Sequence, residues 1–216
     1  MISELIINLK DLISSAPEFL LGAAVIGVLL VISLIKHPTL PKLRTIIASA
    51  LLYFYACYMF DNIVGIPTLS EWRRMRSEGL SIFHPSFNFK LLAYGFNYDI
   101  VLNVLLFVPI GFLAAWASRH YESLLRSFIF GLGVSAVIEL SQMFTALRAT
   151  DIDDLITNTI GAVLGYLIFR LLLIIIGKKH KKEKRQRHGF IYGALPPIIC
   201  AVAFICTFLA GYVRLP

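Results

Sequence analysis

Apolar residues gather in six long stretches along the chain, and polar connections separate them. The stretches cover residues 19–35, 46–64, 100–117, 124–147, 155–176 and 190–213. Each is close to the roughly 20 apolar residues that a helix needs to cross a hydrocarbon core of about 30 Å. The pattern predicts an all-α, polytopic membrane protein with about six transmembrane helices.

The composition supports this class. Hydrophobic residues make up 58% of the chain, above the roughly 45 to 50% of soluble domains. A net charge of +7 would suggest a nucleic-acid partner in a soluble domain. Here most lysines and arginines lie in connections beside apolar stretches, so their charge reflects topology, and we predict no nucleic-acid partner.

The positive charges also predict an orientation. Connections 36–45, 118–126 and 178–188 hold 12 of the 20 lysines and arginines, whereas the opposite side of the membrane holds 7. The positive-inside rule places the richer set of connections in the cytoplasm. We therefore predict a multi-pass protein with both termini outside the cytoplasm.

Three parts can be distinguished along the chain. Residues 1–59 hold an amphipathic segment at 1–15 and two apolar stretches, the second of which ends near residue 64. Residues 60–176 form a core that holds the polar groups described below. Residues 177–216 combine a basic connection with the last apolar stretch.

The connection 65–98 is the longest between apolar stretches, and it contains a predicted surface helix. Thr68 and Glu71 have the spacing of a capping box, and Gly79 is suited to end the helix. The helix carries three arginines whose guanidinium groups are candidate ligands of a lipid phosphate: Arg73, Arg74 and Arg76. The alternative is an ordinary solvated basic face.

Polar groups concentrate in the segment 138–165. Glu139 and Gln142 lie inside an apolar stretch, a short connection with several charged residues follows, and Asn158 lies inside the next apolar stretch. Ionisable groups at membrane depth are costly and usually face a protein interior, a partner or a ligand. Seven polar groups of three predicted helices fall at one depth: Asn103, Glu139, Gln142, Arg148, Asp151, Asp154 and Asn158.

Helical spacing places these groups on facing stripes. Each of the third, fourth and fifth stretches has polar residues at one end of its stripe and small residues at the other. Gly161 and Gly165 have the GxxxG spacing that lets helix backbones approach closely. We therefore predict a tightly packed central three-helix unit, with close packing of the fourth and fifth spans and a polar pocket at one end.

The polar groups can be interpreted in three ways. In the first, the groups form a ligand-binding site in which Arg148 faces an anionic group. In the second, they only join the helices by hydrogen bonds. The third, a divalent cation on Glu139, Asp151 and Asp154, fits the ligand chemistry, but no spacing is diagnostic. We predict a binding site with no metal and no cofactor.

The same residues carry a resemblance to a known family. The matching positions are Asn103, Pro109, Gly111, Glu139, Gln142, Arg148, Asp151, Asp154, Asn158 and Gly161. In their spacing they resemble the VanZ-like family of small bacterial membrane proteins, over roughly residues 60–176. The resemblance implies a location in the bacterial cell membrane. The founding member is linked to resistance to the glycopeptide antibiotic teicoplanin.

Three functions are consistent with the sequence. The first is an outer-leaflet protein of the cell envelope that binds lipid headgroups or an acylated ligand, such as a lipid-linked cell-wall precursor or a lipoglycopeptide, and lowers susceptibility to teicoplanin. The second is an enzyme acting on a lipid or precursor headgroup, with Glu139 or Asp154 as base and Arg148 stabilising negative charge. The third, a transporter, has little support because no inverted repeat is evident.

Overall fold

The computed structural model describes residues 17–37, 41–90, 95, 98–145, 148–177 and 190–210. In chain order, the helices and strands are α2 (Pro17–Lys36), α3 (Lys42–Asn62), α4 (Leu69–Ser77), β1 (Phe87–Asn88), α5 (Tyr98–Ala117), α6 (Leu124–Gln142), β2 (Thr150–Asp151), α7 (Ile152–Ile175) and α8 (Phe190–Leu209). The predicted amphipathic segment 1–15 and the basic connection 178–188 lie outside the described residues.

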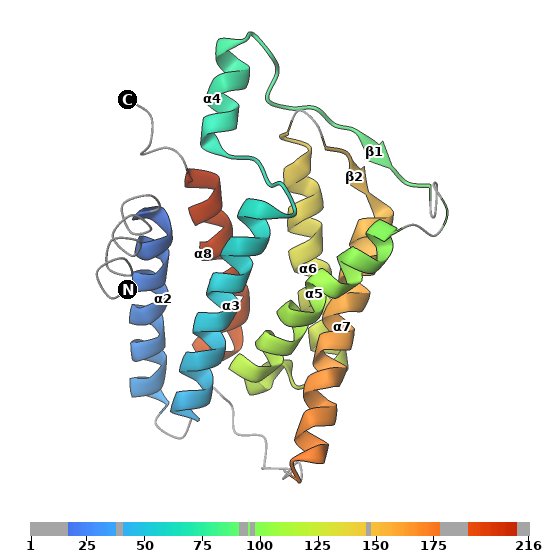
Figure 1. The fold of residues 1–216 in the computed structure, drawn as a ribbon. Coiled ribbons are helices and arrows are strands. Elements are labelled where there is room, and N and C mark those ends of the chain that lie inside the picture. Colours follow the sequence, from blue (N-terminus) through green and yellow to red (C-terminus); the bar gives the residue numbers. More distant parts are fainter. Residues whose placement is uncertain are drawn as a thin grey trace, which may run out of the picture.

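Within the described ranges, six helices are long and apolar enough to cross a membrane: α2, α3, α5, α6, α7 and α8. They correspond to the six apolar stretches, so the prediction of an all-α, polytopic membrane protein is confirmed. Figure 1 shows α4 and the two short strands at one end of the bundle, which we call the upper end. The lower end holds the start of α3 and the 3₁₀ turn Arg119–Tyr121.

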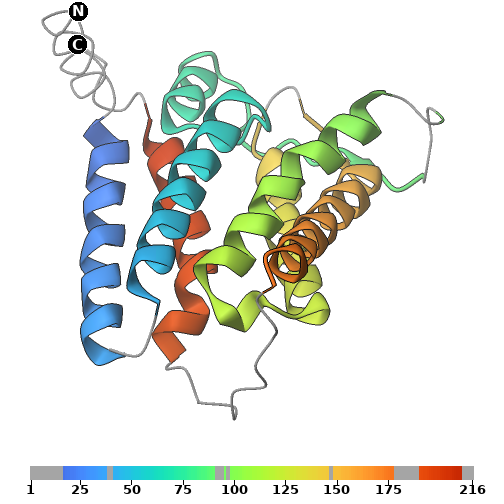
Figure 2. The same cartoon turned by 60° about the horizontal axis from the view of Figure 1, so that its bottom comes forward.

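The long helices form two groups. α2, α3 and α8 lie on one side, and α5, α6 and α7 lie on the other, in both Figure 1 and Figure 2. In the described chain, the most extensive helix contact joins α5 to α7, and α6 also packs along α7. This group is the predicted central three-helix unit. The groups meet where α3 packs against α5.

The α5–α7 contact depends on glycine. A Cβ atom on Gly111 of α5 would overlap the backbone carbonyl of Ala162, and one on Gly161 or Gly165 would overlap carbonyls of α5. We predicted close packing of the fourth and fifth spans, and α6 does pack along α7, but Gly161 itself faces the third span. α6 approaches α7 through Gly131, where an added Cβ would lie 2.5 Å from the Ala162 methyl group.

A buried apolar core joins the two groups of helices. Two tyrosines of α3 add hydrogen bonds to its neighbours. The Tyr55 hydroxyl of α3 donates a hydrogen bond of 2.7 Å to the carbonyl of Leu106, one turn before Pro109 in α5. Proline lacks a backbone donor and distorts the preceding turn of a helix, and the Tyr55 bond ties that turn to α3. Tyr53 lies on the other side of α3 and donates to the carbonyl of Phe19 in α2 at 2.6 Å.

The upper end is tied together by short segments. The predicted surface helix is α4, and the Thr68 side chain caps it by accepting from the Glu71 backbone N–H at 3.1 Å. β1 and β2 form a parallel two-stranded pair with Phe87 opposite Thr150. The pair was not predicted, and it fastens the connection after α4 to the connection between α6 and α7.

The fourth span is shorter than predicted. We expected it to continue to residue 147, whereas α6 ends at Gln142. The carbonyls of Met143 and Phe144 accept hydrogen bonds from the His84 N–H at 2.8 Å and from the Trp72 indole at 2.9 Å. These carbonyls would serve donors of the next turn in a longer helix, so donors from α4 and from the connection after it take the place of that turn.

Candidate functional site

A buried polar layer lies beneath the upper end of the three-helix unit. Glu139 and Gln142 of α6 are each 4% exposed, and Asn158 of α7 is 3% exposed. The Glu139 carboxylate accepts the Asp151 backbone N–H at 2.9 Å. The Gln142 amide donates to the Val64 carbonyl at 3.0 Å, which connects this layer to the end of α3.

A half-exposed layer of acids and amides lies above it. The Asn103 amide of α5 donates to the Asp154 carboxylate of α7 across the helix contact. One oxygen of Asp151 caps α7 by accepting the Asp153 N–H at 2.8 Å, and the other accepts the Asn88 amide at 2.9 Å. The acids are therefore held in place by α5, by β1 and by the start of α7.

Arg148 adds a positive charge beside these acids. Its side chain is exposed, and its guanidinium nitrogens lie 3.0 and 3.1 Å from the position of a Cβ on Gly65. Gly65 has a φ of 64°, a conformation that favours glycine, so the guanidinium lies on bare backbone. Arg148 interacts electrostatically with Glu139 and Asp154, yet none of the described residues forms a hydrogen bond or ion pair with it.

We call these seven residues the upper polar cluster: Asn103, Glu139, Gln142, Arg148, Asp151, Asp154 and Asn158. The structure thus brings together all seven groups that the sequence placed at one depth. It keeps apart the three headgroup candidates Arg73, Arg74 and Arg76. They are exposed on α4, which packs against α8.

Three further residues of the site were missed in the sequence. Asn88 bonds Asp151, Thr150 donates to the Glu139 carbonyl at 2.9 Å, and Gly65 supports Arg148. Thr150 lies between two positions that did stand out and could have been included for that reason. Asn88 and Gly65 belong to the long connection, where no periodicity indicates which side chains meet the helices.

The acids of the cluster are held by protein donors. Among the described residues, no group of three histidines, cysteines, aspartates or glutamates has a geometry that could hold a metal ion. The carboxylates instead accept protein N–H groups.

The three cysteines are buried in hydrophobic surroundings and form no disulfide in the described structure: Cys57, Cys200 and Cys206.

Asn158 gives a test of what the buried layer does. Its amide nitrogen donates to the Ser135 hydroxyl at 3.1 Å, and its amide oxygen is buried without a partner among the described groups. We expect Asn158→Ala to abolish the function proposed below but to lower the free energy of unfolding by only about 1 kcal/mol, the size of such interhelical bonds.

The measurement pairs a functional assay with unfolding in detergent, and Ser135→Ala serves as the matched control because it removes the same bond from the other side. Retained function in Asn158→Ala, with the same small loss of stability in both variants, would make the residue purely structural.

The six apolar helices and the upper polar cluster together define a polytopic membrane protein with buried acidic groups at one end of a three-helix unit. A family model described as VanZ/LLP1 matches residues 20–174, and the chain therefore belongs to the VanZ/LLP1 family. The resemblance found in the sequence is thus confirmed, and the matched range begins in α2, ahead of the 60–176 core.

A named relative supports the assignment. The chain is 28% identical to Protein VanZ of Enterococcus faecium over 138 residues, which cover 64% of this chain and 77% of that protein. No solved structure matches the chain.

Proposed function

We propose that the upper polar cluster binds the headgroup of a lipid or of an acylated ligand in the outer leaflet, and thereby lowers susceptibility to teicoplanin-type glycopeptides. The observation that carries the proposal is Arg148. An exposed guanidinium lies on the Gly65 backbone, beside buried acids, with no hydrogen-bonding partner among the described residues. Such a group is well suited to bind phosphate or carboxylate in a bidentate manner.

The acids define the rest of the ligand. Glu139, Asp151 and Asp154 lie close enough to interact electrostatically with one another, and Arg148 supplies one positive charge against them. A ligand that adds only negative charge would be repelled by these acids. The arrangement therefore favours a headgroup that also carries an ammonium or several hydroxyl groups.

The level of the cluster favours an amphiphilic ligand. Asn103 lies in the second turn of α5 and Asp154 in the first turn of α7, so both lie at a helix end, where headgroups meet hydrocarbon. The distribution of lysine and arginine orients this end away from the cytoplasm. A membrane-anchored molecule in the outer leaflet would reach Arg148 without leaving the bilayer.

Binding has more support than catalysis. The hydroxyls beside the cluster are already engaged, because Thr150 donates to the Glu139 carbonyl and Ser135 accepts the Asn158 amide. Neither forms a hydrogen bond with a carboxylate that could activate it as a nucleophile. A headgroup-modifying enzyme would instead have to activate water or a substrate hydroxyl, and turnover of labelled lipid by the purified protein would reveal it.

The test is drug susceptibility of a sensitive Gram-positive host that expresses the protein. We expect the wild type to protect against teicoplanin more than against vancomycin, because only teicoplanin carries an acyl chain. Arg148→Ala and Glu139→Gln should remove the protection. Loss of a charge-assisted hydrogen bond costs about 1.5 to 3 kcal/mol, and each 1.4 kcal/mol is about tenfold in affinity.

Arg74→Ala is the matched control, since it removes an exposed arginine at the same end of the bundle but outside the cluster. All variants are compared at equal membrane levels. Protection that survives in Arg148→Ala, or that is lost equally in Arg74→Ala, would refute the proposal.

A further inference from the structure

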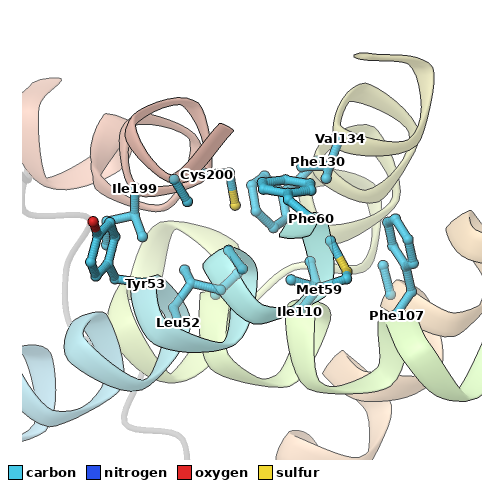
Figure 3. Close-up of a cluster of buried hydrophobic side chains, with 14 of the residues drawn as sticks. Leu52, Tyr53, Met59, Phe60, Phe107, Ile110, Phe130, Val134, Ile199 and Cys200 are labelled. Atoms are coloured by element: carbon cyan, nitrogen blue, oxygen red, sulfur yellow. The ribbon is translucent and has the colours of Figure 1, made fainter. Parts of the chain in front are cut away.

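An apolar groove runs between α6 and α8, away from the upper polar cluster. Its volume is about 560 Å³, within the range of roughly 300 to 1,000 Å³ for small-molecule pockets. Figure 3 shows four of its lining side chains where α3, α6 and α8 meet: Phe60, Phe130, Val134 and Cys200.

Small residues keep the groove open. Gly133 of α6 lines it, and a Cβ at that position would meet nothing within 4 Å. Cys200 and Ala201 line the α8 side. Because α6 and α8 make only a few contacts with each other, the space between them is not filled by the described side chains.

Charged and polar groups lie at the lower end of the same groove. Arg126 and His120 both line it. Nη1 of Arg126 donates to the His120 carbonyl at 2.9 Å and lies 3.3 Å from the His120 ring nitrogen Nδ1. The other guanidinium nitrogens of Arg126 form no hydrogen bond with any residue in the described ranges.

The surroundings of the histidine beside this arginine favour its neutral form. Partial burial, followed in size by the charge of Arg126, lowers the pKa of His120 from its usual 6.5. A neutral ring can accept from Arg126 through Nδ1. Among the described residues that line the groove, Arg126 therefore supplies the positive charge at this end. Its remaining N–H groups are available to a ligand.

The length of the groove matches one leaflet. From Arg126 to Val137 there are 11 residues of helix, which span about 17 Å at 1.5 Å per residue. Half of a hydrocarbon core of about 30 Å is about 15 Å. A groove that starts at a cation and continues over one leaflet has the shape of a phospholipid, with its phosphate at the interface and one chain inside.

We propose that this groove is a binding site for an anionic glycerophospholipid of the leaflet at the lower end, with the phosphate on Arg126 and one acyl chain between α6 and α8. The site is independent of the function proposed above, because it uses other residues, on the lower part of α6 and on α8, and the opposite leaflet. The apolar lining accepts any chain, and Arg126 provides the preference for negative charge.

Two variants test the groove and its cation separately. Gly133→Phe places a ring in the groove at a position where an added Cβ meets nothing within 4 Å, and Arg126→Gln removes the charge. Gly27→Phe is the matched control, because a Cβ on Gly27 of α2 also meets nothing within 4 Å. The detergent-solubilised full chain is titrated with palmitoyl-oleoyl phosphatidylglycerol or phosphatidylcholine, and bound lipid is counted by native mass spectrometry.

We expect the wild type and Gly27→Phe to retain phosphatidylglycerol over phosphatidylcholine. Gly133→Phe should lower the affinity for both lipids by about tenfold or more. Arg126→Gln should lower it by about tenfold for phosphatidylglycerol, since a charge-assisted contact is lost, and by less for phosphatidylcholine, whose choline cation offsets the phosphate charge. A phosphatidylglycerol with a photoreactive acyl chain should crosslink to the α6 and α8 residues that line the groove.

Three results would overturn the proposal. Gly133→Phe could bind phosphatidylglycerol as tightly as Gly27→Phe does. The wild type could bind both lipids equally, with crosslinks spread over α2 and α7. Alternatively, Gly133→Phe could abolish a dimer of the chain while leaving lipid binding unchanged, which would make the groove an interface between two copies.

Discussion

Replacing Gly111 by alanine should leave little folded protein. The added methyl group would overlap the Ala162 carbonyl, with its carbon atom 2.6 Å from the new Cβ and its oxygen closer still. The obstacle is helix backbone, which cannot move aside as a flexible side chain can. α5 and α7 would have to separate along the most extensive helix contact in the described chain. Overpacking of this kind costs about 1 to 3 kcal/mol, and more where backbone is involved.

The measurement is the yield of monodisperse protein by fluorescence-detected size exclusion, together with the midpoint of thermal unfolding. Gly133→Ala is the control, because its new methyl group enters open space, and there alanine should be neutral or stabilising by up to about 1 kcal/mol. If Gly111→Ala gave the same yield and midpoint as Gly133→Ala, α5 and α7 would not be packed backbone to backbone.

Replacing Arg44 by methionine should also destabilise the protein strongly, by about 3 kcal/mol. Arg44 donates to the carbonyls of Trp116 and Ala115 at 2.7 and 2.8 Å, at the lower end of α5. It also forms an ion pair with Glu122 at 2.9 Å, and its guanidinium lies over the Phe169 ring of α7. Removing Arg44 leaves a nearly buried carboxylate and two carbonyls without this donor. Loss of one partner of a buried ion pair is strongly destabilising, because the other charge stays buried without compensation.

Arg44→Lys separates charge from geometry. Lysine keeps the charge but cannot donate to three acceptors in one plane, so we expect it to recover only part of the loss. Unfolding in detergent of Arg44→Met, Glu122→Gln and the double variant measures the coupling of the two residues. A coupling close to zero, with a small loss in Arg44→Met, would show that the arginine serves orientation in the membrane only.

The spans could be predicted because a membrane imposes one demand on every crossing helix. Six apolar stretches correspond to six helices, and most of their limits agree within a few residues. The exception is α6, beyond whose end His84 and Trp72 donate to the carbonyls of Met143 and Phe144. Both donors come from a distant connection, and local apolar content carries no information about them.

The upper polar cluster could be predicted as a set but not as a network. Helical spacing placed polar residues of three helices at one level, whereas the structure divides them into a buried layer and a half-exposed layer at the same end of the unit. Spacing shows on which face of α7 Gly161 lies, but it does not show which helix covers that face. The sequence therefore did not reveal that Gly161 packs against α5. Two-residue strands have no periodicity to detect. The α6–α8 groove could not be predicted from the sequence for a different reason. Its apolar lining has the same composition as a helix surface that faces lipid.

The contacts at the upper end also imply an order of assembly. Gln142 and Val64 are 78 residues apart, Trp72 and Phe144 are 72 apart, and Asn103 and Asp154 are 51 apart. Contacts between such distant residues close large loops and tend to form after local structure. α3 would therefore wait in the membrane, with the Val64 carbonyl that follows it lacking its Gln142 donor, until α6 and the start of α7 had been synthesised. A cell that can sense the completed cluster would be sensing that the whole helix bundle has come together.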